Sequence, residues 1–445
     1  MTEEKHYERK KYTESAARVP KITRINITAP LHAKEEGKKV AYCFIACIYD
    51  EIIRAMDIVP MWTETYSGIC AVKRDTTRFL ERAEAENFSR SLCTYATCGL
   101  GFDLFREKLG KMPENAPWGG QARPDMMLSS GQILCDPRYK WYQAVQQYMS
   151  DVPIYANGFL WPTYEYDMDY REVEGYYVKY AVEELRGLVK FLEKQTGKKM
   201  NWDHLSERVD LTDKTWDMFW RAYELRKAIP TPMDTGDAMN TMVPLAFNLG
   251  TQEAFDFYKD LYEELKYRVD NKIGVVPETE EKYRLIWAGG LPPWFALRDF
   301  EYFHSKGAVF PVERTYREAE LIENLDLPKV SDPLEHIVWR WIRYYTHWYD
   351  KARQRTGSFP EIERLIEYIE GYKIDGIVMH EAFSCRTWHP GLIWQSSVLK
   401  KVYRNIPSLI LESDIVDISS YSEADTHNKI DIFIETLEDF KSQRR

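Results

Sequence analysis

Short apolar runs, each followed by a helical pattern, constrain the fold of this chain more than any other feature of its sequence. In its first third the runs cover residues 39–46, 58–62, 125–128 and 152–156, and in its last third 284–287, 308–312, 375–379 and 408–412. Strands that alternate with helices are typical of βαβ units, whose strands lie parallel. The sequence therefore predicts an α/β fold with two parallel sheets of the Rossmann or flavodoxin type.

The organisation of the chain follows from where these patterns stop. Residues 1–36 are polar and lack periodicity, which predicts an extended N-terminal arm lying across the body of the protein or a partner. Residues 164–270 have apolar positions at steps of three and four, which is typical of helices. We therefore expect an arm over 1–36, a first α/β domain over 37–163, a helical segment over 164–270 and a second α/β domain over 271–445.

Composition excludes several classes of protein. The net charge is −10 with both signs interspersed and no basic block, so nucleic acid is not expected as a partner. No window of 18 apolar residues occurs, so we expect no contact with a membrane interior. Residues 1–11 are charged and lack the apolar core of a signal peptide. We expect a cytoplasmic protein whose seven cysteines are reduced.

Three of the cysteines stand apart from the rest. A free cysteine is most often a small buried apolar side chain, and Cys70, within an apolar run, fits that description. Cys93, Cys135 and Cys385 instead each fall where a loop gives way to a predicted helix. The positive end of a helix favours a thiolate, and loops at the carboxyl ends of parallel strands lie close together. The spacing therefore predicts one site shared by these three thiols.

The chemistry of that site stays open on spacing alone. No C-x2-C pair of a zinc site and no ferredoxin run is present. Cys385 could act as a nucleophile with His380 or His389, but that leaves two thiols unexplained. Three thiolates from separate loops would suit an iron–sulfur cluster with an open coordination position.

Longer motifs carry a resemblance to a known family. They are Cys93-Thr-Tyr with Leu100-Gly101, the Cys135-Asp136 pair, Arg284-Leu-x-Trp-x-Gly-x-x-Pro-x-Trp294, and Asp375-Gly376 with Cys385. In combination they resemble the 2-hydroxyacyl-CoA dehydratase superfamily. The runs at residues 42–55, 71–75 and 135–142 most resemble its branch of benzoyl-CoA reductase B subunits.

The resemblance implies a cofactor and partners. Each subunit of this family offers three cysteines to an iron–sulfur cluster, and by motif these fall on Cys93, Cys135 and Cys385. The further thiols Cys43, Cys47 and Cys98 leave open whether the cluster is a [4Fe–4S] cluster or a double-cubane cluster. A paralogous cluster-binding subunit is implied as the partner.

The resemblance also implies an activity, the ATP-dependent reduction of the ring of benzoyl-CoA by single electrons. Such electrons need a donor near the low limit of protein clusters, about −700 mV. Because the chain has no G-x-x-x-x-G-K-[ST] loop, ATP hydrolysis falls to ATPase (activator) subunits with their own [4Fe–4S] cluster, fed by ferredoxin. The alternatives are a 2-hydroxyacyl-CoA dehydratase subunit, which removes water through a ketyl radical, and a non-catalytic scaffold subunit.

Residues that could deliver protons or bind the substrate are proposed because they lie near Cys385 or in predicted loops. His380, His389 and Glu381 are candidates for proton delivery. Trp287, Trp294 and Trp388 are candidates for an aromatic wall, and the loops at 230–239 and 289–293 for the channel of the aromatic acyl-CoA.

Overall fold

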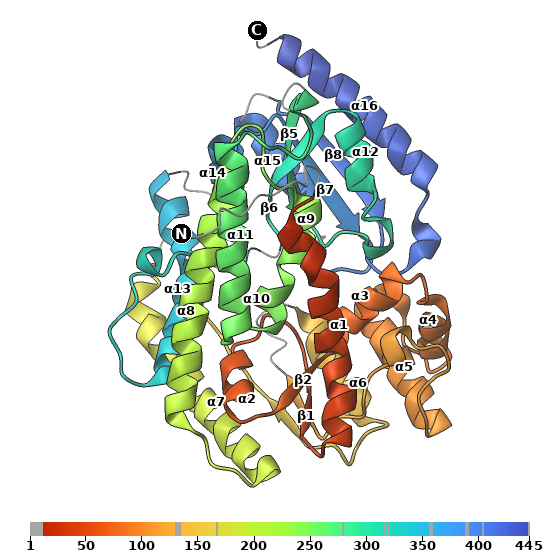
Figure 1. Cartoon of the computed structure of the whole chain (residues 1–445), viewed down its shortest axis with the longest axis vertical. Helices are drawn as coiled ribbons and strands as arrows, with labels where there is room; N and C mark the ends of the chain where they lie inside the picture. The colour runs from red at the N-terminus through yellow and green to blue at the C-terminus, as the bar shows by residue number, and fades with distance from the viewer. Residues whose placement is uncertain are drawn as a thin grey trace, which may run out of the picture.

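The computed structural model contains two four-stranded sheets in which every neighbouring pair of strands is parallel (Figure 1). It describes residues 12–129, 135–165, 168–277, 280–315, 317, 320–355, 359–387, 391–402 and 405–443. The predicted α/β class with two flavodoxin-like parallel sheets is therefore confirmed.

The first sheet has the strand order β2-β1-β3-β4. Its strands are β1 (Val40–Cys43), β2 (Val59–Trp62), β3 (Met126–Ser129) and β4 (Ile154–Ala156). The helices around it are α2 (Asp50–Ala55), α3 (Thr63–Val72), α4 (Thr77–Glu84), α5 (Thr94–Leu109) and α6 (Asp136–Gln146). Every residue of β1 and β3 is buried, which is why both strands appear in the sequence as unbroken apolar runs.

The second sheet has the strand order β6-β5-β7-β8. Its strands are β5 (Tyr283–Gly289), β6 (Ala308–Glu313), β7 (Gly376–Ala382) and β8 (Ser408–Ser413). The helices of this half are α12 (Asp299–Ser305), α13 (Pro333–Arg355), α14 (Pro360–Gly371), α15 (Leu392–Val402) and α16 (Glu423–Ser442). Helix α16 packs against β8 and α12 at the outer edge of the sheet (Figure 1).

The segment between the sheets is helical, as its periodicity predicted. It consists of α7 (Arg171–Thr196), α8 (Trp202–Glu224), α9 (Thr235–Thr241), α10 (Val243–Phe247) and α11 (Gln252–Asp270). Helix α13 packs on α7 and α8, and its Arg340 forms a buried ion pair with Glu51 of α2. The long helices therefore join the two sheets into one body (Figure 1).

The extended conformation predicted for the N-terminal arm is wrong over residues 14–35, whereas residues 1–11 lie outside the described residues. Residues Glu14–Glu35 form helix α1, which runs beside β2 and against α9, α10 and α11. Thr13 caps it by accepting a hydrogen bond from the Ala16 N–H. The buried side chains of α1 are Ser15, Ala16, Val19, Thr23, Ile27, Pro30 and Ala33. They recur every three to four residues, but most of them are small or polar. The sequence therefore shows no apolar stripe.

Across the described ranges, none of the helices combines the length and the apolar character needed to cross a bilayer.

Candidate functional site

A cavity of about 400 Å³ lies where the carboxyl ends of the two sheets face each other. Part of its lining follows directly on strands of both sheets, namely Ile45, Glu64, Leu291, Thr315, Cys385 and Ile415. The remainder comes mainly from α1, α3, α9 and α10. Open α/β sheets bind their ligands at this edge, so the cavity is the candidate functional site.

All three cysteines singled out in the sequence line this cavity. Cys93 is the N-cap residue of α5 and Cys135 the N-cap residue of α6, as their loop-to-helix positions predicted. Cys385 lies in the turn after β7, where its backbone N–H donates to the Ala382 carbonyl at 2.9 Å. Three loops from distant parts of the chain thus bring their thiols to one space.

The surroundings of Cys93 and Cys135 favour the protonated form of both thiols. Burial raises the pKa of Cys93 well above its usual value, and the nearby Cys135 and Cys385 thiols raise it further. Burial likewise raises the pKa of Cys135 to about 11, although the Arg138 guanidinium opposes the shift. A positively charged metal group between the thiols would reverse this preference, because metal binding deprotonates a thiol.

The donor set is compatible with an iron–sulfur cluster. Three thiols from separate loops line one cavity, and cysteine thiolates are the usual ligands of such clusters.

The other four cysteines are buried and are not among the described residues that line the cavity. Cys43 ends β1 in the core, and burial raises the pKa of its thiol well above the usual value. Cys47 lies behind the cavity wall, where its sulfur accepts a hydrogen bond from the Arg138 guanidinium at 3.8 Å. Cys70 and Cys98 lie beside each other between α3 and α5.

An ion pair that sequence reasoning missed lies in the cavity wall. Arg138, in the first turn of α6, donates to both carboxylate oxygens of Glu64, at 2.8 and 2.5 Å. The guanidinium also lies over the Phe44 ring, 5.3 Å from its centroid. The signal for Arg138 was present, because an arginine three residues after Cys135 falls within the first turn of the same helix.

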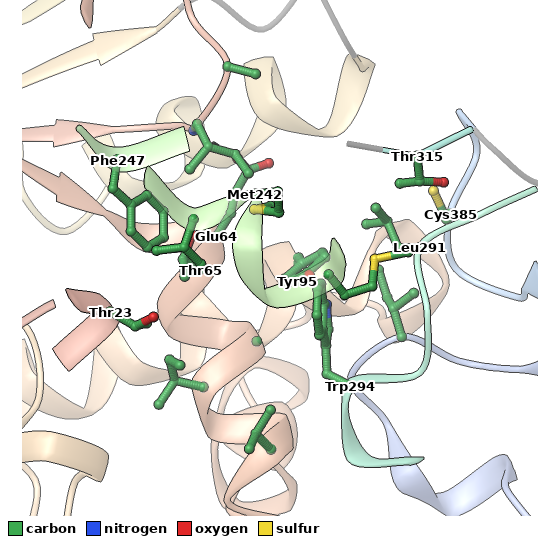
Figure 2. A pocket seen from close by; sticks show the side chains of 18 of the residues that line it. Thr23, Glu64, Thr65, Tyr95, Met242, Phe247, Leu291, Trp294, Thr315 and Cys385 are labelled. Atoms are coloured by element: carbon green, nitrogen blue, oxygen red, sulfur yellow. Dashed lines mark hydrogen bonds between the residues drawn. The ribbon is translucent and has the colours of Figure 1, made fainter. Parts of the chain in front are cut away.

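The rest of the lining is largely apolar and aromatic. Trp294 lines the cavity and donates its indole N–H to the Tyr95 hydroxyl. Leu291 and Met239 come from the two segments predicted to line it, although residues 235–239 of the segment predicted as a loop belong to helix α9. Figure 2 shows Cys385 at one end of the cavity and Phe247 and Thr23 at the other. A flat apolar group would be enclosed between these ends.

Trp287, in contrast, is buried in the core of the second sheet. It packs against Phe300 and Phe310, and its indole N–H donates to the Gly290 carbonyl at 3.1 Å. It is not among the described residues lining the cavity. Trp388 and His389 lie outside the described residues.

His380, a candidate for proton delivery, is completely buried in β7. Its Nδ1 contacts the Leu291 carbonyl and its Nε2 the Ser413 hydroxyl at 2.8 Å, so both ring nitrogens are engaged. Burial lowers the pKa of His380 to about 4, so the ring is neutral at neutral pH. Neither His380 nor its partly exposed neighbour Glu381 is among the described lining residues.

These features define a class of protein, an α/β protein with two parallel sheets and a cysteine-lined cavity between their carboxyl ends. A family model described as 2-hydroxyglutaryl-CoA dehydratase, D-component, matches residues 47–437. The chain belongs to this family, as its motifs indicated.

Similar proteins within the family differ in activity. The chain is 25% identical to the B subunit of benzoyl-CoA reductase from Thauera aromatica, over 92% of this chain and 91% of that protein. It is 24% identical to the (R)-phenyllactyl-CoA dehydratase alpha subunit of Clostridium sporogenes, over 92% of each chain. It is also 24% identical to the (R)-2-hydroxyisocaproyl-CoA dehydratase alpha subunit of Clostridioides difficile, over 93% of each. The chain is therefore similar over most of its length to subunits of multi-subunit acyl-CoA enzymes.

Proposed function

We propose that this chain is the cluster-binding subunit of an ATP-dependent reductase that acts on benzoyl-CoA or a close aromatic analogue. The product is a cyclohexadiene-carbonyl-CoA, formed by two electrons and two protons per ring. The observation that carries the proposal is the meeting of Cys93, Cys135 and Cys385 in one cavity between the sheets.

In this proposal the three thiolates hold an iron–sulfur cluster at one end of the cavity. When bound, such a cluster supplies single electrons at low potential. Two of the thiols begin helices, α5 and α6, whose positive ends stabilise the thiolate charge. The Arg138 guanidinium adds a fixed positive charge beside Cys135.

The apolar part of the cavity supports an aromatic acyl group as the substrate. Trp294 and Tyr95 are fixed to each other by a hydrogen bond and present ring surfaces to the cavity. Aromatic rings gain stacking energy from such neighbours, and apolar walls exclude water from a strongly reduced substrate. Glu64, a carboxylate in the lining, is neutralised by Arg138.

The partners follow from what the chain lacks and from the names of its relatives. Because its sequence has no P-loop, we propose separate ATPase subunits with a [4Fe–4S] cluster, supplied by ferredoxin. A paralogous cluster-binding subunit completes the proposed enzyme, since the similar proteins are themselves named as B and alpha subunits.

A 2-hydroxyacyl-CoA dehydratase subunit is the second candidate, because the similar proteins from Clostridium sporogenes and Clostridioides difficile are dehydratase subunits. The two activities differ in their consumption of electrons. The purified complex should be given reductant, ATP and either benzoyl-CoA or (R)-phenyllactyl-CoA, and reductant counted per product. Two electrons per product support the reductase, whereas a dehydratase uses electrons only in catalytic amounts.

If Cys385→Ala left turnover intact in an assembled complex, the chain would be a scaffold.

A further inference from the structure

A second cavity, of about 980 Å³, lies at the opposite end of β2 from the cysteine-lined cavity. Its lining includes Val59 and Pro60 at the start of β2, whereas Glu64, just after the strand, lines the first cavity. The two cavities therefore lie at the two ends of one edge strand.

Successive turns of helix α1 line both spaces. On α1, Pro20 and Thr23 line the first cavity, and Asn26 and Ala29 line the second. Three residues of helix advance about 4.5 Å, so the second cavity begins roughly one turn beyond the first. Phe247, the last residue of α10, lines the first cavity, and Gly250, in the loop before α11, lines the second. Phe247 and Thr23 mark the end of the first cavity that lies away from Cys385 (Figure 2).

Two arginines face the second cavity with most of their donors unused. Arg54 of α2 donates to the Phe247 carbonyl, and Arg208 of α8 donates to the Gly250 carbonyl at 3.0 Å. The Nε atoms of both are buried and have no hydrogen-bond partner. Among the described residues, no carboxylate forms an ion pair with either guanidinium.

The other charges around this cavity include carboxylates that act on Arg54, because Asp50 and Glu253 both favour its charged form without forming an ion pair with it. The lysines that line it are engaged elsewhere, Lys38 with Glu36, Lys39 with Asp125 and Lys198 with Asp57. Asp50, one turn before Arg54, is buried, and burial together with Glu51 raises its pKa well above the usual value. Glu207 and Glu253 are the further carboxylates among the described lining residues.

A helix end adds to the positive potential. Helix α11 has 19 residues, and its N-cap Thr251 and first residue Gln252 both line the cavity. The N-terminus of a helix of this length attracts anions. Two guanidiniums with free donors beside it are suited to phosphate, which arginine binds with paired hydrogen bonds.

We propose that Arg54 and Arg208 bind the phosphate groups at the nucleotide end of a CoA thioester whose acyl group occupies the cysteine-lined cavity. This inference rests on the proposed function, because it takes an acyl-CoA as the ligand of the first cavity. In this assignment the pantetheine arm passes between α1 and the end of α10 and separates Asn26 from Asn248, whose side chains are hydrogen-bonded at 3.0 Å. An adenine nucleotide end bearing several phosphates fits the larger and more polar of the two cavities.

Binding measurements on the full chain test this assignment. Benzoyl-CoA, benzoyl-pantetheine, adenosine 3′,5′-bisphosphate and inorganic pyrophosphate are titrated calorimetrically into the wild type, Arg208→Gln, Arg208→Lys and Arg54→Lys. Arg208→Gln should bind benzoyl-CoA and the bisphosphate about tenfold to a hundredfold more weakly, as expected for a lost charge-assisted hydrogen bond. Its affinity for benzoyl-pantetheine, which lacks the nucleotide, should not change. Both lysine variants keep the charge and should lose less.

Arg186→Gln is the matched control, because Arg186 of α7 pairs with Asp332 and is not among the described residues lining either cavity. Unchanged affinity of Arg208→Gln for benzoyl-CoA would overturn the assignment, and so would equal losses for benzoyl-CoA and benzoyl-pantetheine. Pyrophosphate binding as tight as that of the bisphosphate would indicate a general phosphate site instead. If the bisphosphate binds in an Arg208-dependent way but no benzoyl-CoA is reduced, the phosphate site stands and the reductase proposal fails.

Discussion

Arg138 and Glu64 form a bidentate ion pair in the wall of the cysteine-lined cavity, although 74 residues separate them in the chain. The side chain of Arg138 is 4% exposed and that of Glu64 is 14% exposed. Charges screened this little by water act over several ångströms. The pair therefore sets the electrostatic potential at Cys135, three residues before Arg138.

The reduction potential of the proposed cluster should respond to the two charges in opposite directions. Arg138→Gln removes a positive charge that stabilises the reduced state, so the potential should fall. Glu64→Gln removes a negative charge, so the potential should rise. Each shift should be on the order of 100 mV for a charge several ångströms away at an effective dielectric constant of about 20. A redox titration monitored by EPR measures both.

The control for this pair is Lys140→Gln, because Lys140 is a solvent-exposed cation on the same helix. The reduction potential of the cluster in the Lys140→Gln variant should match that of the wild type. Shifts of the same sign in Arg138→Gln and Glu64→Gln would mean that structural disturbance, not charge, governs the potential.

Trp294 should determine the affinity for the aromatic ring. Trp294→Leu keeps an apolar wall but removes the ring stacking, which is worth about 0.5–1.5 kcal/mol, or roughly twofold to tenfold in affinity. The KM for benzoyl-CoA should rise by that factor, while the KM for an aliphatic acyl-CoA changes less. Trp202→Leu, an exposed tryptophan on α8, should change neither value. Equal effects on the KM values of both substrates would show that Trp294 does not stack on the aromatic ring.

Stability should fall in acid because of His380. Its pKa is about 4 in the folded protein against 6.5 for an exposed histidine, so between these values the unfolded chain binds the proton that the folded chain excludes. This contribution of His380 to the free energy of unfolding is present in full above pH 6.5 and is lost as the pH falls to 4. It amounts to about 3 kcal/mol in all. His380→Asn should flatten the pH dependence of the unfolding free energy by this amount, measured by guanidinium unfolding.

His204→Gln, which changes an exposed histidine on α8, should keep the wild-type slope. The same slope in His380→Asn would show that the buried ring is not the group responsible.

Two glycines should respond oppositely to alanine. A Cβ at Gly101 of α5 would lie 1.8 Å from the Phe79 carbonyl oxygen of α4, so Gly101→Ala must push the helices apart. Overpacking of this kind costs about 1–3 kcal/mol. Gly175 of α7 has no atom within 4 Å of a built Cβ, so Gly175→Ala should stabilise by about 0.5–1 kcal/mol. Thermal unfolding distinguishes the two, and a stabilised Gly101→Ala would contradict the close packing of α4 and α5.

Local patterns were sufficient to predict the sheets and two of the three cysteine positions. Buried parallel strands are apolar throughout, and a helix that begins at Cys93 or Cys135 is marked by its own sequence. Helix α1 was missed because long-range contacts stabilise it. The Thr13 N–H donates to Asp237 at 2.6 Å, and Ser15 donates to Glu264, partners more than 200 residues away.

The candidate residues that lie outside the described cavity lining, such as His380 and Trp287, share one explanation. Whether a polar side chain beside a cysteine faces the cavity or the core depends on contacts distant in sequence. His380 lies between Leu291 and Ser413, and neither neighbour is visible from its position near Cys385. The role of Arg138 was missed for the same reason, because its partner Glu64 lies in the first turn of α3, 74 residues away in the chain.

Iron and acid-labile sulfide, measured under strict exclusion of oxygen together with an EPR spectrum, test the proposed cluster most directly. Cys93→Ala, Cys135→Ala and Cys385→Ala should each lose the iron and the signal while remaining folded, whereas Cys98→Ala, a buried control outside the cavity lining, should keep both. Wild-type protein free of iron, or iron retained in all three variants, would contradict the assignment of these thiols to one cluster.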